Sequence, residues 1–265
     1  MNSTLLAKEL KSNAFVAIII FAVLGMYIAC IVMMFDPSLG ESLNMMMDSM
    51  PELFAAFGMG TQATTLLDFM LNYLYGFLLT VFPFVLILIM ANKLMVRYLD
   101  RGTMSYLLAT PNSRVRVALT LAGAMMVVLA LLMVLTTAAE IACAELMFPG
   151  DLDIPGLFRA NVGLFCLWTF LAGMCFFSAC AFSNAGAALW VGGGAGIAFF
   201  LMQMVAKVGD KLAFLDKVNP LAMFDSYGLA TSDASAYAGS AILLALGIAL
   251  FALAIGVFNR RDLSI

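Results

Sequence analysis

The chain of 265 residues contains no histidine, and only 11% of its residues are charged. Without histidine it cannot hold a Ser-His-Asp triad, a zinc site of the HExxH type or an imidazole proton relay. The net charge of −3 leaves no basic face for nucleic acid. No GxxxxGK[ST] motif is present, so the chain has no Walker site for ATP. We therefore predict neither catalytic residues nor enzymatic activity on this chain.

Metal-ligand patterns are also missing. The five cysteines form no CxxC pair, and four of them fall in long apolar runs, where cysteine is an ordinary packing residue. The acidic residues of the segment 36–68 match no calcium-binding loop. The sequence therefore predicts no metal site.

What the chain has in excess is apolar side chains. Hydrophobic residues make up 64% of it and the mean hydropathy is +1.05, whereas soluble domains are about half apolar. So few charged residues cannot cover the surface of a soluble fold that is this apolar. The composition predicts an all-α integral membrane protein, with residues 1–265 forming a single transmembrane domain.

Long intervals without a charged residue locate the membrane spans. There are five, and the interval 160–206 is 47 residues long. About 20 residues cross the hydrocarbon core as a helix, so this interval holds two spans, separated by the Ser-Asn-Ala-Gly turn signal at 183–186. The first span is too long for a signal peptide and is expected to stay as an anchor. The six predicted spans cover about residues 14–35, 70–92, 117–139, 160–182, 187–206 and 236–258.

Lysine and arginine are unevenly shared between the two sides of the membrane. The N-terminal segment, the loop 93–116 and the C-terminal tail hold nine basic and three acidic residues. The opposite side holds four basic and thirteen acidic residues. The positive-inside rule then makes both termini and the loop cytoplasmic. We expect a multi-pass protein of the cell inner (cytoplasmic) membrane, surrounded by the lipid bilayer.

Two segments outside the spans have amphipathic patterns. Residues 1–13 predict an N-terminal interfacial helix, with Leu6 and Leu10 on its apolar side and Glu9 on its wet side. Residues 208–237 predict an outer hairpin between spans 5 and 6, which Asn219-Pro220 divides into two short helices. The methionine-rich outer segment 36–68 is expected to rest on the bilayer and to contain a short helix.

Four residues within the predicted spans carry specific expectations. Pro83 frees a backbone carbonyl in the second span, and a neighbouring group must satisfy it. Gly192 and Gly196 form a small-xxx-small pair, which permits close packing with another helix or another subunit. Glu140, near the outer end of the third span, is a candidate for the transport pathway because intramembrane acids are usually functional. The alternative is that Glu140 reaches the membrane interface from this depth.

The loop after the second span is the most informative stretch of the chain. A Gly-Thr pair at 102–103 can start and cap a helix, and a Thr-Pro pair at 110–111 ends it. Between them, Met104, Leu107 and Leu108 fall at i, i+3 and i+4 on one face. A helix of about two turns is not stable alone in water. It must therefore dock on lipid or on a partner protein.

These residues together resemble the membrane subunit of an ABC-2 type ATP-binding cassette exporter (an ABC transporter permease). The specific part runs from Arg101 to Arg114 and is similar to the family's cytoplasmic loop, acid-x-GT-x-x-x-LL-x-x-P-x-SR. Arg101 stands where the family has its acid, and Asp100 is shifted from it by one position. Segments 50–58, 219–220 and 258–263 also resemble the family.

The resemblance implies that this loop is a cytoplasmic coupling helix that docks in a groove of a separate ABC ATPase. Its residues would be Arg101, Gly102, Thr103, Met104, Leu107, Leu108, Pro111 and Arg114. Six spans are half of the family's usual twelve, which implies two ATPase copies and a second permease subunit, identical or homologous. ATP and magnesium would bind the ATPases, and this chain would bind no cofactor. The implied function is efflux of an apolar or amphipathic substrate, such as a drug, a peptide or a lipid-like molecule.

Two other functions remain open from the sequence. A substrate-binding membrane subunit of a vitamin importer also has about six spans, but it would lack the docking loop. An ion-coupled secondary transporter would need several buried charges and an internal repeat. The predicted spans contain no charge besides Glu140 and show no repeat.

The six-span topology predicts where a reporter that is active only outside the cell will work. Fusions within Asp36–Asp68, Glu145–Asp153 or Asp210–Asp233 should be active, and fusions within Lys93–Arg116 should be inactive, because only the former are outside. Reporter activity of whole cells measures this. Activity of a fusion at residue 105 would overturn the topology.

Overall fold

In the computed structural model the described residues are 2–35, 49–50, 65–96, 113–182, 184–208 and 210–260. These residues form helices and the turns between them, and no strand occurs among them. Six helical segments in this part of the chain are long and apolar enough to cross a membrane. The protein is therefore an all-α, multi-pass membrane protein, as the composition predicts.

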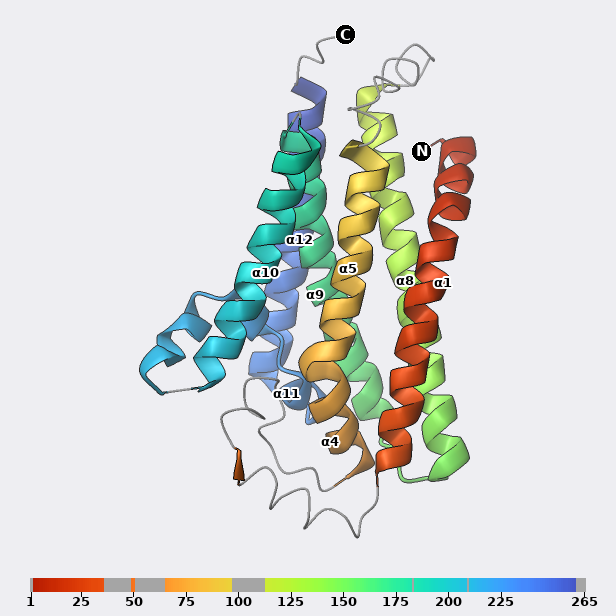
Figure 1. The fold of residues 1–265 in the computed structure, drawn as a ribbon, viewed down its shortest axis with the longest axis vertical. Helices are drawn as coiled ribbons and strands as arrows, with labels where there is room; N and C mark the ends of the chain where they lie inside the picture. Colours follow the sequence, from red (N-terminus) through yellow and green to blue (C-terminus); the bar gives the residue numbers. More distant parts are fainter. Residues whose placement is uncertain are drawn as a thin grey trace.

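The six segments run side by side along the long axis of the molecule (Figure 1). Five are single helices: α1 (Ser3–Met34), α8 (Arg114–Met147), α9 (Ile154–Ala181), α10 (Ala185–Val208) and α12 (Ala234–Arg260). The second segment is composite and consists of α4 (Leu66–Met70), η1 (Leu71–Leu78), α5 (Leu79–Ala91) and η2 (Asn92–Val96). Both η1 and η2 are π-helical. Helices α9 and α10 are separate, with the break at residues 182–184, where the sequence predicts a turn.

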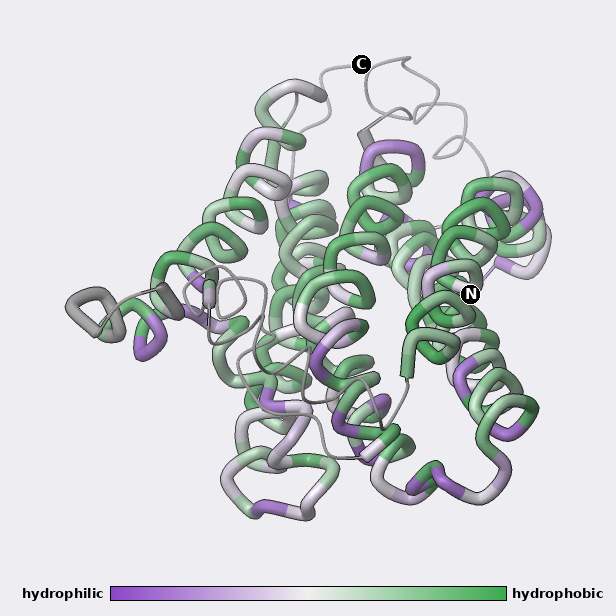
Figure 2. The backbone as a smooth tube through the Cα atoms, turned by 60° about the horizontal axis from the view of Figure 1, so that its bottom comes forward, coloured by the Kyte–Doolittle hydropathy of each residue, from purple (hydrophilic) through white to green (hydrophobic). Residues whose placement is uncertain are grey.

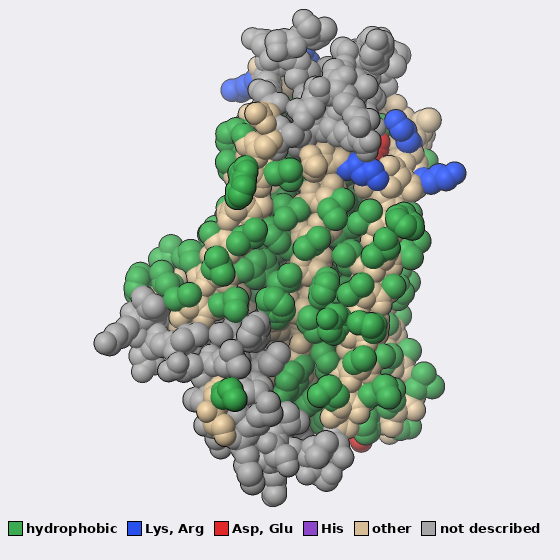
Figure 3. Space-filling view, in the orientation of Figure 1, with side chains coloured by type: hydrophobic (Ala, Val, Ile, Leu, Met, Phe, Trp, Pro, Cys, Tyr) green, Lys and Arg blue, Asp and Glu red, His purple; other side chains and the backbone are tan. Residues whose placement is uncertain are grey.

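Polar and apolar side chains are distributed along the bundle as a membrane requires. Hydrophobic residues cover the middle of the helices and hydrophilic residues gather towards their ends (Figure 2). Helix α1 begins, η2 ends, α8 begins and α12 ends at one end of the bundle. The lysine and arginine side chains visible in Figure 3 lie at this same end. Which side of the membrane this end faces stays a prediction of the positive-inside rule.

Helix α9 is the centre of the bundle. In its most apolar stretch 78% of the residues are buried, against 22% for α1 and for α10. It packs against α5, α8, α10, α12 and the short helix α11 (Ser226–Ala230), whereas α1 packs mainly on α8. The outer helices therefore expose apolar faces, and α9 is the most deeply buried of the six segments.

Neighbouring helices approach one another most closely at glycine residues. A Cβ on Gly173 of α9 would lie 2.6 Å from the Gly247 carbonyl oxygen of α12, so only glycine fits there. Of the pair singled out in the sequence, Gly192 lies against Ser178 and Cys175 of α9, and Gly196 faces the ring of Phe84 in α5. Both therefore pack against helices of the same chain. On α9 the tighter α9–α12 approach involves Thr169 and Gly173, which form a small-xxx-small pair, whereas Gly247 of α12 has no small residue four positions away.

Pro83 in α5 has the partner that its position requires. A proline removes the hydrogen bond to the carbonyl four residues earlier, which here is Leu79. Trp168 of α9 donates its indole N–H to this Leu79 oxygen at 2.8 Å, and both residues are fully buried. The bond satisfies the carbonyl and ties α5 to the central helix.

The N-terminal segment differs from its prediction in two ways. Residues 3–34 form one continuous helix, so the expected interfacial helix is the first part of α1 and not a separate element. The expectation that Glu9 lies on the wet side is wrong, because Leu5, Glu9 and Asn13 form a buried face at i, i+4 and i+8. The reason is α8, which packs along α1 and accepts the Asn2 backbone N–H on Thr120 Oγ1 at 3.0 Å.

The outer hairpin consists of three short helices where the sequence predicts two. They are η3 (Asp210–Lys217), η4 (Pro220–Met223) and α11 (Ser226–Ala230), and Asn219-Pro220 separates the first from the other two. Asn219 also donates its side-chain amide to the Phe199 carbonyl of α10 at 2.9 Å. Arg159 of α9 donates to the Leu229 and Ala230 carbonyls, where a cation complements the C-terminus of α11. These hydrogen bonds anchor the hairpin to α10 and α9.

We predict that Trp168→Phe lowers the midpoint of thermal unfolding in detergent. The change keeps a ring in place but leaves the buried Leu79 carbonyl unsatisfied, which costs about 1–3 kcal/mol. The matched control is Trp190→Phe, because Trp190 on α10 is 81% exposed. Equal shifts for both variants would show that the indole hydrogen bond does not stabilise the bundle.

Candidate functional site

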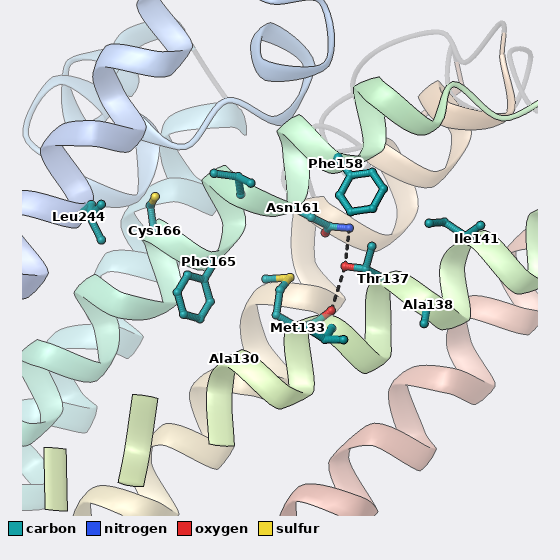
Figure 4. A pocket seen from close by; sticks show the side chains of 12 residues that line it. Ala130, Met133, Thr137, Ala138, Ile141, Phe158, Asn161, Phe165, Cys166 and Leu244 are labelled. Carbon is teal, nitrogen blue, oxygen red and sulfur yellow. Dashed lines mark hydrogen bonds between the residues drawn. The ribbon is translucent and has the colours of Figure 1, made fainter. Parts of the chain in front are cut away.

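A groove opens between α8, α9 and α12, with a volume of about 590 Å³. Its walls are mostly apolar, and two polar side chains, Thr137 and Asn161, take part in them. Figure 4 shows these two pointing toward one another from α8 and α9. The principal apolar lining residues are Ala130, Met133, Ile141, Phe158, Phe165 and Leu244.

The groove is accessible from the lipid-facing surface. Val134 of α8 and Val162 and Phe158 of α9 line it and are each more than half exposed. Since both helices are long and apolar enough to cross a membrane, the mouth of the groove opens on the surface of the bundle that lipid would cover. A pocket of this size and composition is typical of sites for drug-sized apolar ligands.

A buried cluster of hydrogen bonds lies behind the polar part of the groove wall. Asn161 donates its side-chain amide to Thr137 Oγ1 at 3.0 Å and to Glu140 Oε2 at 2.8 Å. Tyr75 of η1 donates its hydroxyl to Asn161 Oδ1 at 2.7 Å and lies 3.3 Å from Glu140 Oε2. Thr137 in turn donates to the Met133 carbonyl at 2.8 Å. All four side chains are buried, so the cluster joins η1, α8 and α9 inside the bundle.

Glu140 is the unusual member of this cluster. Its side chain is 0% exposed, so the alternative that it reaches the interface is wrong. Both of its hydrogen-bond partners share Oε2, and Oε1 has no partner among the described residues. Four buried side-chain atoms in the described part of the chain lack a partner, and only Glu140 Oε1 belongs to an ionisable group within a spanning helix. No described lysine or arginine forms an ion pair with it.

Such an arrangement suits reversible binding more than catalysis. A buried carboxyl with one free oxygen accepts a hydrogen bond, a proton or a cationic group. In the described residues no group of three or more acidic or cysteine side chains is placed to hold a metal ion. The cluster contains no nucleophile paired with a base, because Thr137 already donates to a backbone carbonyl.

A second, smaller cavity of about 120 Å³ lies on the other side of Tyr75. Its lining is polar and includes Tyr75, Thr80, Gln203 and Asp225. Tyr75 therefore stands between this polar cavity and the Asn161–Glu140 pair. It is carried by the π-helical turn η1, and π-helical turns occur frequently at functional sites.

The sequence-predicted site residues are distributed over distant parts of the bundle. Six of the coupling-helix residues and the proline that ends it, Arg101, Gly102, Thr103, Met104, Leu107, Leu108 and Pro111, lie outside the described residues. Arg114 is the first residue of α8, directly after Ser113, which caps the helix by accepting the Arg116 backbone N–H. Glu140 lies on the same helix, roughly 39 Å further along it. Gly192 and Gly196 pack against α9 and α5 and do not line the groove.

Two members of the cluster, Tyr75 and Asn161, were not among the site residues predicted from the sequence. Each is one of several polar residues within an uncharged interval, where a polar side chain is usually a hydrogen-bonded packing residue. The one available signal was that Asn161 is the first strongly polar residue of the 47-residue interval. Only the contact with Glu140 gives them a functional meaning.

Comparison with known proteins adds no identity to this site. The chain matches no protein-family model, and no curated protein matches it significantly. The function therefore has to be inferred from the residues and their geometry.

We predict that Glu140→Met does not lower the thermal stability of the protein in detergent, whereas Asn161→Leu does. Removing a half-satisfied buried carboxyl in favour of a well-packed apolar side chain is often neutral or stabilising. Asn161→Leu instead removes the hydrogen bonds of Asn161 to Glu140, Tyr75 and Thr137, keeps only the 3.3 Å contact between Tyr75 and Glu140, and should cost about 1–3 kcal/mol or more. If Glu140→Met destabilises as much as Asn161→Leu, the carboxyl serves the fold and not a functional site.

Proposed function

We propose that this chain is the permease subunit of an ABC-2 type exporter, which moves apolar or amphipathic substrates across the cytoplasmic membrane. The observation that carries the proposal is the resemblance of the stretch 101–114 to the coupling loop of that family. The order of the elements supports it, since this stretch falls between the second and third of six spanning segments. The flanking elements lie at the end of the bundle where α1 begins, because η2 ends there and α8 begins there (Figure 1).

Helix α8 suggests how movement of the loop would reach the groove. It starts at Arg114, where the loop ends, and continues without a proline to Met147. Thr137, on the groove wall, lies about 35 Å along this helix from Arg114. A helix of this kind transmits displacement as a rod, so closure of ATPases on the loop would shift α8 against α9. That shift would change the groove between them.

The proposal includes the partners that the family resemblance implies. Two ABC ATPase subunits would bind and hydrolyse ATP with magnesium, and a second permease subunit, identical or homologous, would complete the pathway. Both termini of this chain would be cytoplasmic. The permease itself would do no chemistry.

Buried Glu140 favours a second candidate, an ion-coupled secondary transporter. A carboxyl inside the membrane without a described cationic partner is the kind of group that binds a coupling proton or ion. The absence of further charges and of an internal repeat in the sequence places this candidate second.

The ATPase-docking hypothesis predicts the effect of Leu107→Asp combined with Leu108→Asp. The two carboxylates would be buried in the partner's groove at a cost of several kcal/mol, so co-purification of the ATPase should be lost. The matched control, Tyr106→Asp with Ala109→Asp, adds the same charges to the opposite face of the predicted helix and should retain the ATPase. Membrane insertion should be normal in both variants.

Two results would overturn the proposal. One is an ATPase that co-purifies equally with the wild type and with the Leu107/Leu108 variant. The other is transport that follows an imposed pH gradient after ATP depletion and is lost in Glu140→Gln. The second result would identify the ion-coupled transporter instead.

A further inference from the structure

The groove between α8, α9 and α12 combines an apolar volume with a buried carboxyl behind its wall. Thr137 and Asn161 line it, and Glu140 Oε2 accepts a hydrogen bond from Asn161 Nδ2 at 2.8 Å. The carboxyl therefore lies one hydrogen bond behind the wall. Its Oε1 is buried and has no partner among the described residues, so the site has acceptor capacity left over.

The charged groups around the groove determine the sign of the charge that a ligand can carry. No lysine or arginine lines the groove, and within the described residues none forms an ion pair with Glu140. In an apolar environment a carboxylate is screened far less than in water. It therefore attracts a cation and repels an anion.

The apolar walls determine the size and polarity of the rest of the ligand. About 590 Å³ suits a drug-sized body, and Phe158 and Phe165 offer aromatic faces, which attract cations as well as apolar groups. The mouth is formed by exposed residues of two spanning helices, so the ligand enters from the bilayer. A molecule that partitions into the membrane and carries a positive charge meets all of these conditions.

We infer that this groove is a binding site for amphipathic cations. The apolar body occupies the groove, and the cationic group lies against Asn161 and Thr137 and compensates the charge of Glu140. This inference rests on the proposed function, because it names the substrate class of the proposed transporter. Binding itself needs neither ATP nor a partner.

The test is equilibrium binding to the full-length chain in lipid nanodiscs, without any ATPase. The probes are radiolabelled tetraphenylphosphonium, which is an apolar cation, and triphenylphosphine oxide, which is similar in its rings but neutral. The wild type should bind the cation more tightly than the neutral probe. Glu140→Gln should weaken binding of the cation by roughly tenfold or more and leave binding of the neutral probe unchanged. The unchanged neutral probe also shows that the variant is folded.

A second pair of variants locates the site. Val162→Trp fills the mouth of the groove at a side chain that is 65% exposed, and it should weaken binding of both probes. Its matched control is Ile18→Trp on α1, where the side chain is 63% exposed and lies far from the groove lining, and it should weaken neither.

Three results would overturn the inference. Cation binding that is unaffected by both Glu140→Gln and Val162→Trp would place the probe elsewhere. Equal binding of both probes, insensitive to Glu140→Gln, would make the groove a site for lipid chains. A change in oligomeric state in Val162→Trp, with probe binding intact, would make it an interface between copies. None of these affects ATPase co-purification, so the binding site can fail while the proposed function stands.

Discussion

Inside a membrane every polar group of the chain must find its partner within the protein, because the hydrocarbon layer offers none. The described helices follow this rule at most of their buried polar groups; within the spanning helices Asn13 Oδ1, Glu140 Oε1 and Ser240 Oγ are the exceptions. Trp168 satisfies the carbonyl that Pro83 frees, and Thr120, Thr136 and Thr169 return their hydroxyls to carbonyls of the preceding turn. The same need explains why α9 is central, since it provides the donors that reach α5, α8 and α11.

Among the described spanning helices, Glu140 is the ionisable group at which this rule is only half met, and it therefore marks the candidate site. A fold selected for stability alone would replace a carboxyl with one unpartnered oxygen by an apolar side chain. Its position behind the groove wall, with Tyr75 and Asn161 as its partners, instead makes it a group that can be completed by something that binds. Helix α8 connects this position directly to the end of the proposed docking loop at Arg114.

Particular residues show which features of the structure could be predicted from the sequence and which could not. Uncharged intervals located all six spanning segments, and the turn signal at 183–186 separated α9 from α10. The need of Pro83 for a carbonyl partner was predictable, but its identity as Trp168 was not. Glu9 was assigned to water because its neighbours Lys8 and Lys11 are polar, and it is buried because α8 covers that face of α1. Thr169 and Gly173, which lie against Gly247, form a small-xxx-small pair, but the pair does not identify α12 as its partner.

The sequence alone determined the class of protein, the number of spans and the places where they break. It could do so because the cost of a charge in hydrocarbon acts residue by residue along the chain. Only the tertiary structure decided that Tyr75, Glu140 and Asn161 meet, and that they lie behind one apolar groove. Which polar residues face each other depends on how far each helix is rotated and shifted against its neighbours. That choice is made by the packing of all the helices together, and no single segment records it.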